Sequence, residues 1–376
     1  MIYIHVPFCQ SRCIYCDFYS TVLGLEYREK YVEKACLEIT RRASELHAAP
    51  LRSVYFGGGT PSLLEPRQLG RLLEAVARHH VLSPDTEITL EGNPDDVTAE
   101  RVAQWRSMGI NRVSLGVQSL HDATLRLLRR RHTAAQAVNA VDTLVKGGIG
   151  NVSIDLIYGL PGQTLSQWTE DLDAALRLPV THLSSYALSV EEGTALHAML
   201  MDHRVETASD ELYLSEYELL IDKAREHHFK HYEVSNFALD GRESRHNSGY
   251  WEGVPYVGIG PGAHSYDGCR TRRHNLPDLK GYVAEEDSVP HELEHLSLRE
   301  RFNEAVFTAL RTSRGLDVKA LLQDYPREWV DDLSVAARSH ISGGRLRYAK
   351  SGRLCLTRSG LFVSDDVMSD FMVVEA

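Results

Sequence analysis

Near its start the chain reads Ile4-His5-Val6-Pro7-Phe8-Cys9-Gln10-Ser11-Arg12-Cys13-Ile14-Tyr15-Cys16, and this segment decides the fold. Its three thiols follow the spacing Cys-x3-Cys-x2-Cys. A structural zinc site closes its shell with four ligands. A [4Fe-4S] cluster that is held by three thiolates instead leaves one iron without a protein ligand. The spacing therefore predicts a cluster whose open iron can chelate a small molecule.

Taken alone, the three cysteines could also be an incomplete zinc site or three unrelated thiols. Two features favour the cluster. The three cysteines follow a predicted strand and lie in a loop with the aromatic residues Phe8, Tyr15 and Phe18, whose rings would shield a cluster. No fourth cysteine and no pair of histidines lies nearby at the spacing of a zinc site.

The composition is that of an ordinary globular protein. The 376 residues are 43% hydrophobic and 25% charged, which allows about two domains with a large buried core. The formal net charge of −11 argues against general binding of nucleic acid or of an anionic membrane surface. We expect no membrane span and no signal peptide, and six cysteines do not form a disulfide framework. A reducing cytoplasm is the expected compartment.

Three cysteines lie outside the first segment. Cys36 shares a helical face with Val32 and Ile39, so it is expected to be a buried core thiol. Cys355 lies among alternating apolar residues and is interpreted in the same way. Cys269 falls in a loop, with no role evident from its neighbours.

The first half of the chain alternates short apolar strands with amphipathic helices. The expected strands are Ile2–His5, Ser53–Phe56, Glu87–Glu91, Arg112–Gln118, Val152–Asp155 and His182–Ala187. Six such repeats predict an α/β fold with parallel strands and right-handed crossovers. The pattern leaves open whether the sheet is open or forms part of a barrel. A complete eightfold barrel is not expected, because eight repeats are not visible.

Nearly every expected strand ends in an unusual residue. The second ends in Gly57-Gly58-Gly59-Thr60-Pro61, and later strands end at Glu91, Gln118 and Asp155. The carboxyl ends of parallel strands carry the active site in such folds, so these residues predict one site along one edge. Each also has a simpler interpretation. The glycine run by itself favours a tight turn, and either carboxylate could be a solvated strand end.

The second half is expected to contain a helix from Glu211 to His228, a short strand at Tyr232–Ser235 and a polar loop region over 242–266. We place a boundary in the charged segment Glu285–Asp287. The expected units are residues 1–240, 241–290 and 291–376. In the last unit, Ser297-Leu298-Arg299-Glu300 is a capping box, and a hairpin is expected over Arg345–Thr357. Helices followed by a hairpin resemble a winged helix, but acids balance bases there, so nucleic-acid binding is not expected.

A second unusual segment is Arg245-His246-Asn247-Ser248-Gly249-Tyr250-Trp251. His246 offers a ligand nitrogen for a metal, and Tyr250 and Trp251 offer flat apolar faces. The alternative is that the segment packs on the barrel, because the chain has 18 histidines and most histidines are structural.

Together these segments resemble radical S-adenosylmethionine (SAM) enzymes, in particular the oxygen-independent coproporphyrinogen III oxidase-like group. The matching runs are the cysteine segment, Gly57–Pro61, Glu91–Pro94, Gly116–Ser119, Asp155–Pro161 and Tyr232–Phe237. The resemblance implies a partial (β/α)6 barrel with a small C-terminal helical, winged-helix-like domain. It implies a [4Fe-4S] cluster on Cys9, Cys13 and Cys16, with SAM on the open iron. The SAM positions that match are Tyr3, Tyr15, Gly58, Gly59, Thr60, Glu91, Gln118, Arg130, Asp155 and Ala187. His264 falls at another such position with a different residue.

Two features depart from the oxidase. Its cysteine motif continues with a fourth cysteine where this chain has Phe18, and its N-terminal extension has no counterpart in the eight residues before Cys9. Both features, and the signature His246-Asn247-x-x-Tyr250-Trp251, resemble the heme chaperone subgroup. The resemblance therefore implies a heme chaperone that passes heme to acceptor proteins.

The alternative that stays open is radical decarboxylation of coproporphyrinogen III. Implied partners are heme, heme-acceptor proteins and an electron donor to the cluster, and the protein is expected to be a monomer or homodimer in the cytoplasm. The heme candidates are His246, Asn247, Tyr250 and Trp251, and Cys269 is an alternative ligand.

Overall fold

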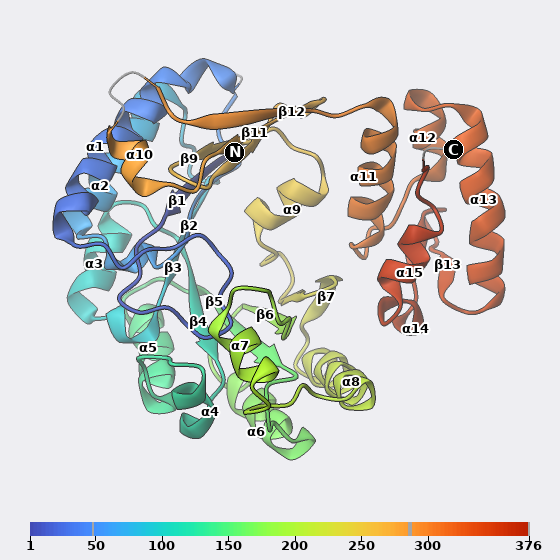
Figure 1. Ribbon diagram of the computed structural model, residues 1–376, viewed down its shortest axis with the longest axis horizontal. Coiled ribbons are helices and arrows are strands. Elements are labelled where there is room, and N and C mark those ends of the chain that lie inside the picture. The colour runs from blue at the N-terminus through green and yellow to red at the C-terminus, as the bar shows by residue number, and fades with distance from the viewer. Residues whose placement is uncertain (47–48, 285–287, 375–376) are drawn as a thin grey trace.

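The computed structural model describes residues 1–46, 49–284 and 288–374. Among these residues, the main sheet has nine strands in the order β7-β8-β6-β5-β4-β3-β2-β1-β9 (Figure 1). Its centre is a run of parallel strands: β1 (Ile2–Val6), β2 (Ser53–Gly58), β3 (Glu87–Gly92), β4 (Arg112–Gln118), β5 (Asn151–Tyr158) and β6 (His182–Ala187). The predicted α/β fold with a parallel core is confirmed, and each predicted strand ends within a few residues of the observed one.

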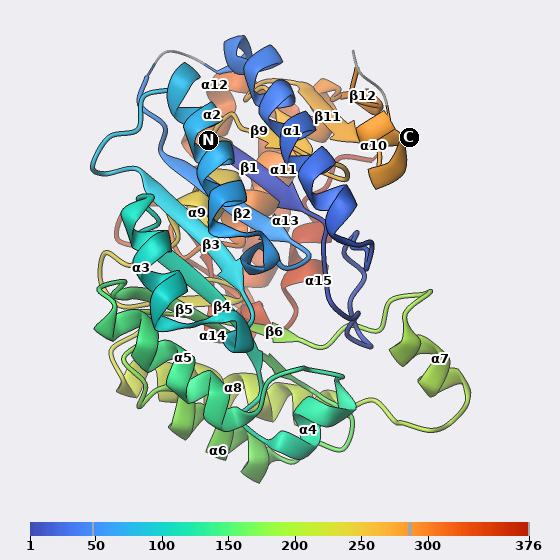
Figure 2. The same ribbon diagram turned by 90° about the vertical axis from the view of Figure 1, so that its left-hand side faces the viewer.

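Helices cover the outer face of this curved sheet (Figure 2). They are α1 (Leu25–Arg41), α2 (Pro66–His79), α3 (Ala99–Ser107), α4 (Asp122–Leu127), α5 (Ala134–Lys146), α6 (Leu165–Ala175) and α8 (Asp210–Glu226), with short 3-10 turns η1 (Ala43–Glu45), η2 (Pro61–Leu63) and η3 (Pro94–Asp96). Helix α7 (Ala195–Met201) projects away from the sheet (Figure 2), and its Leu196 packs with Ile14. The helices pack by apolar faces, as in α2, which buries Leu69, Leu72 and Val76 against the sheet.

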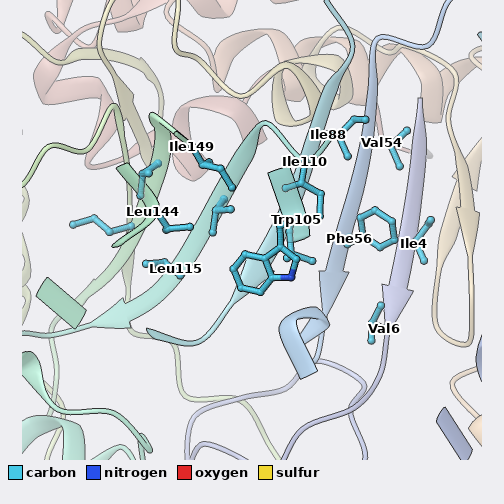
Figure 3. Packing of buried hydrophobic residues seen from close by; sticks show 14 of the residues in the cluster. Ile4, Val6, Val54, Phe56, Ile88, Trp105, Ile110, Leu115, Leu144 and Ile149 are labelled. Atoms are coloured by element: carbon cyan, nitrogen blue, oxygen red, sulfur yellow. The ribbon is translucent and has the colours of Figure 1, made fainter. Parts of the chain in front are cut away.

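Alternation along the strands separates the core from the barrel interior. Ile4 is paired in register with Phe56, and Figure 3 shows both among the buried apolar side chains. The intervening residues Tyr3, His5 and Tyr55 point to the opposite face, because successive side chains of a strand point to alternate faces of the sheet. The barrel interior is therefore lined by polar and aromatic side chains.

The main sheet ends at β9 (Val257–Ile259), which is parallel to β1, and at β7 (Lys230–Glu233). Strand β8 (Asn236–Ala238) lies between β7 and β6 and is antiparallel to both. Because β7 and β9 lie at opposite ends of the strand order, the barrel is partial. Helix α9 (Arg245–Trp251) lies near the open side of the barrel, between β7 and β9 (Figure 1). The expectation of a loop over 242–266 was wrong here. The helix is short and contains Gly249, so it depends on tertiary packing that propensity does not predict.

A second sheet extends from β9. It consists of β10 (His264–Tyr266), β11 (Thr271–Asn275) and β12 (His291–His295), all antiparallel, with α10 (Leu279–Ala284) between the last two. Tyr256, just before β9, bridges to Tyr266 in β10. The predicted boundary at Glu285–Asp287 lies outside the described residues.

The C-terminal region forms a separate apolar cluster that includes Phe302, Val306 and Leu310. Its elements are α11 (Leu298–Leu310), α12 (Val318–Asp324), α13 (Arg327–Ser342), β13 (Leu346–Tyr348), β14 (Leu354–Leu356), α14 (Arg358–Leu361) and α15 (Ser364–Ser369). The predicted capping box at Ser297 and the predicted hairpin, β13–β14, are both present. No helix in the described ranges is long and apolar enough to cross a membrane.

Candidate functional site

The cysteine loop, residues 7–24, leaves β1 at the carboxyl edge of the sheet and is attached to the glycine run after β2. The backbone N–H of Thr60 donates to the carbonyl oxygen of Phe8 at 2.8 Å. A Cβ atom on Gly59 would lie 2.8 Å from the same oxygen, and Gly58 has a φ of +108°. Glycine is required at both positions, so the run is a tight turn and a site of close backbone approach.

Arg130 connects the cysteine loop to the sheet. One guanidinium nitrogen lies 3.2 Å from the sulfur of Cys13, and another donates to the carbonyl oxygen of Gly116 and to the side-chain oxygen of Asn93. The adjacent Arg131 instead pairs with carboxylates in the turn after β3. The structure thus separates two arginines that composition could not distinguish, and it brings a half-buried cation against a thiol.

The other two thiols lie in the same loop. Cys9 Sγ is 3.5 Å from the hydroxyl of Thr60. Burial, followed by the nearby charges of Cys13 and Cys9, raises the pKa of the Cys16 thiol to about 11. Within the described ranges, no three metal-ligating side chains converge closely enough to hold an ion. The thiols are therefore neighbours that a bound cluster would have to draw together and deprotonate.

Glu91, at the end of β3, is held beside the glycine run. Its carboxylate accepts hydrogen bonds from the hydroxyl of Tyr55 at 2.6 Å and from the backbone N–H of Gly58 at 3.3 Å. Burial, with a smaller contribution from the charge of Asp155, raises the pKa of Glu91 to about 7. This carboxyl can therefore accept or donate a hydrogen bond near neutral pH.

Asp155 and Gln118 continue the same edge on β5 and β4. Asp155 accepts a hydrogen bond from Ser114 at 3.3 Å, and burial raises the pKa of its carboxyl. Gln118 has a φ of +71°, a left-handed conformation that is uncommon outside glycine. Ala187 is exposed at the end of β6. These strand ends lie along one edge, as the sequence predicts.

The two tyrosines among the predicted SAM positions lie at different depths. The Tyr3 hydroxyl is 3.1 Å from Nδ1 of His5, and its ring stacks on Tyr55 inside the barrel. Tyr15 lies in the cysteine loop, where burial raises the pKa of its hydroxyl beside Cys13. Tyr15 therefore borders the thiols, whereas Tyr3 lies farther inside.

His246 lies inside the partial barrel and is only 1% exposed. Its Nδ1 is 2.8 Å from the hydroxyl of Ser53, and its Nε2 is 2.8 Å from the hydroxyl of Tyr250. Its ring stacks on Tyr55 at a centroid distance of 4.9 Å. Burial lowers the pKa of this imidazole to about 3. Both nitrogens are engaged, so this arrangement argues against His246 as a heme ligand and favours the packing interpretation.

The other heme candidates of this segment lie around His246. The backbone N–H of Asn247 donates to the side chain of Ser244, and Tyr250, rather than Asn247, contacts the imidazole. Trp251 is half-buried, and the guanidinium of Arg311 lies over its ring at 5.1 Å. The segment therefore packs α9 onto the barrel on one side and onto the C-terminal region on the other.

A cavity of about 1170 Å³ lies between the barrel, on the side of β1, and the C-terminal region. Tyr3 and His5 of β1 and Phe18 of the cysteine loop contribute to its lining, together with residues of α9, β10, β11 and α11. Phe18 is 65% exposed, so the expectation that this ring shields the thiols was wrong. The cavity exceeds the size of typical sites for small ligands.

Several residues at the edge were not singled out from the sequence. Tyr55 and Ser114 hold the two carboxylates, and Asn93 holds Arg130. The sequence does contain a pattern that could have identified Tyr55 and Ser114. Parallel strands that are buried on both faces are usually continuous apolar runs, so polar residues within them mark an interior that holds something else.

Comparison with known proteins gives consistent matches over the whole chain. Residues 3–175 match the model of the Radical SAM superfamily. The chain is 31% identical to the heme chaperone HemW of Bacillus subtilis, covering 98% of both proteins. It is 36% identical to the heme chaperone HemW of Mycobacterium tuberculosis, covering 98% of this chain and 93% of that protein.

Among solved structures, the chain is similar to coproporphyrinogen III oxidase (HemN) from Escherichia coli, described as a radical SAM enzyme. The TM-score is 0.83 at 21% identity, covering 98% of this chain and 89% of that one. At this identity the match establishes the shared fold alone.

Proposed function

The chain belongs to the HemW family of heme chaperones within the radical SAM proteins, and we propose that it binds heme and transfers it to acceptor proteins. The observation that carries this proposal is the identity to HemW proteins over nearly the full length. The chain would act in the cytoplasm, as a monomer or homodimer. Its three regions, 1–240, 241–290 and 291–376, would serve as barrel, heme-binding connection and C-terminal domain.

The family implies a resident [4Fe-4S] cluster, and Cys9, Cys13 and Cys16 fit it. The donor set is three neighbouring thiols, and the guanidinium of Arg130 beside Cys13 would stabilise a thiolate. The cluster would supply one-electron chemistry from an external electron donor. The chain's contribution is to hold the thiols at the edge of the sheet and to release the proton of Cys16, whose pKa is raised, when the cluster is loaded.

We propose that SAM lies along the same edge. Gly58 and Gly59 allow close backbone approach, and Glu91 and Asp155 are acceptors for hydroxyl or ammonium groups. The remaining proposed contacts are Tyr3, Tyr15, Thr60, Gln118, Arg130 and Ala187. Because the pKa of Glu91 is about 7, SAM binding through this carboxylate should be favoured above neutral pH.

The alternative is radical decarboxylation of coproporphyrinogen III, as in the structural relative HemN. It shares the cluster and the fold, so neither distinguishes the two functions. Phe18, at the position of the oxidase's additional cysteine, favours the chaperone.

One experiment separates the two functions. The reconstituted protein is incubated without oxygen with SAM, a reductant and coproporphyrinogen III, and a parallel sample is titrated with heme. The chaperone predicts a stoichiometric change in the Soret band and no decarboxylated product. Product formation without a heme complex would select the oxidase.

A further inference from the structure

The hairpin of β10 and β11, residues 264–275, carries three side chains that can bind iron. His264 and His274 lie on its two strands, and Cys269 lies in its connecting turn. All three line the 1170 Å³ cavity. Imidazole and thiolate are established axial ligands of heme iron. We refer to residues 264–275 as the donor hairpin.

The two imidazoles of the donor hairpin face each other. His264 pairs with His274 in the strand register, and their rings stack at a centroid distance of 4.2 Å with an interplanar angle of 10°. Across the ranges that the structure describes, neither ring makes a hydrogen bond, in contrast to His246. The His264 side chain is exposed to the cavity, so its nitrogens are accessible to a ligand.

The rest of the cavity combines aromatic side chains and two arginines with the acidic residues Asp17, Glu252, Glu304 and Asp324. Tyr256, Tyr266 and Phe307 line the cavity, and aromatic side chains offer large apolar contact surfaces. Arg272 and Arg301 also line it, and arginine pairs with carboxylates through two parallel hydrogen bonds. Arg272 pairs with a carboxylate of α11 at 2.7 Å through one nitrogen, which leaves further N–H donors.

We propose that heme binds in this cavity with His264 as an axial ligand to iron and with His274 as a positioning residue stacked against it. Arg272 and Arg301 face the propionates, and the aromatic side chains cover the porphyrin. This assignment rests on the proposed function, because it gives the location of the same heme. It moves the heme site from α9 to the donor hairpin and places it beside the cysteine loop, whose Phe18 lines the same cavity.

The test is heme titration of the full chain, reconstituted with its cluster, followed through the Soret band. His264→Ala should change the spectrum and weaken binding by roughly ten- to a hundredfold or more, since loss of a group that merely orients a ligand already costs that much. His246→Ala should keep the wild-type heme spectrum. His295→Ala is the matched control, because His295 is exposed on the adjacent strand β12 and does not line the cavity.

Two further variants test the details. His274→Ala should weaken binding less than His264→Ala, and His274→Phe should restore it, because phenylalanine keeps the stacked ring without a ligand nitrogen. Ala305→Trp on α11 fills the cavity from the opposite wall and should weaken binding without altering any donor. Circular dichroism and cluster content establish that each variant is folded.

The outcomes are distinguishable. If the wild type binds no heme, the proposed function fails together with this assignment. If the wild type binds heme and both His264→Ala and Ala305→Trp retain its spectrum and affinity, the function stands and the cavity is not the site. If only Cys269→Ser changes the spectrum, the ligand is the thiolate and the role of His264 is refuted.

Discussion

Two histidine regions lie close together in the chain and differ in almost every physical respect. His246 is buried among Ser53, Tyr55 and Tyr250, with both nitrogens engaged. His264 lies on an exposed strand face beside His274, and among the described residues its ring stacks on His274 without a hydrogen bond. The first arrangement stabilises the barrel, whereas the second leaves nitrogens available to a metal. A histidine in a distinctive sequence segment is therefore not evidence of a ligand until its partners are known.

The largest expected effect concerns a third region, the cysteine loop, and tests whether cluster binding is independent of both histidine regions. Cys13→Ala removes one of the three proposed cluster ligands and should abolish the visible absorbance of the reconstituted cluster. Cys36→Ala is the control, because that thiol lies on α1 and contacts the backbone of Arg71. Full cluster content in Cys13→Ala, or its loss in His246→Ala or His264→Ala, would contradict this separation.

The two histidine regions should differ sharply in their contribution to stability. His246→Ala leaves a cavity and two unpaired buried hydroxyls, so it should lower the free energy of unfolding by about 3–5 kcal/mol. His264→Ala on the exposed face should change it by less than about 0.5 kcal/mol. Urea unfolding followed by circular dichroism measures both. Equal losses in the two variants would remove the distinction between a packing histidine and an available one.

SAM binding should respond to the carboxylates at the strand ends and not to the buried His246. Asp155→Ala and Glu91→Ala each remove a charged hydrogen-bond acceptor, which is worth about 1.5–3 kcal/mol, so each should weaken SAM binding about tenfold or more. Calorimetry on the cluster-loaded protein gives the affinity, with His295→Ala on the exposed strand β12 as the control. Wild-type affinity in both carboxylate variants would refute the placement of SAM.

The pH dependence of stability sharpens the comparison further. The pKa of His246 is about 3 in the folded chain and ordinarily about 6.5, so the unfolded chain binds the extra proton between these values. The contribution of His246 to the free energy of unfolding is therefore fully present above pH 6.5 and is lost progressively as the pH drops toward 3. Between pH 7.5 and pH 5 this single group should account for about 2 kcal/mol.

His246→Gln removes that contribution, so its stability should fall less over this pH interval than that of the wild type. Urea unfolding at the two pH values gives the difference. His264→Gln is the matched control and should preserve most of the wild-type pH dependence. An unchanged pH dependence in His246→Gln would mean that the imidazole is not held neutral in the folded protein.

Much of the fold could be predicted from the sequence, because the first half repeats a pattern of short apolar strands and amphipathic helices. The strands at Arg112–Gln118 and His182–Ala187 have the predicted bounds, and the capping box at Ser297 begins α11 as expected. Helix α9 and strand β9 were missed. Each is short and polar or rich in glycine, so contacts with distant residues determine its structure rather than local periodicity.

The candidate site also has a part that could be predicted from the sequence and a part that could not. Strand ends bring the polar edge residues together by topology, so Glu91 and Asp155 could be placed from the sequence alone. The burial of His246 could not, since it depends on Ser53 and Tyr55 in β2, nearly two hundred residues away in sequence. The cavity could not be predicted either, because it forms only where α11 lies opposite the donor hairpin.

The central claim is that the chain delivers heme, and transfer from the loaded protein tests it most directly. Heme-loaded wild type is mixed with an apo form of a b-type hemoprotein, and the Soret bands of donor and acceptor are followed with time. We predict that the donor band decays as the acceptor band grows, with heme conserved between them. Retention of heme by the chain, with no growth of the acceptor band, would contradict the account.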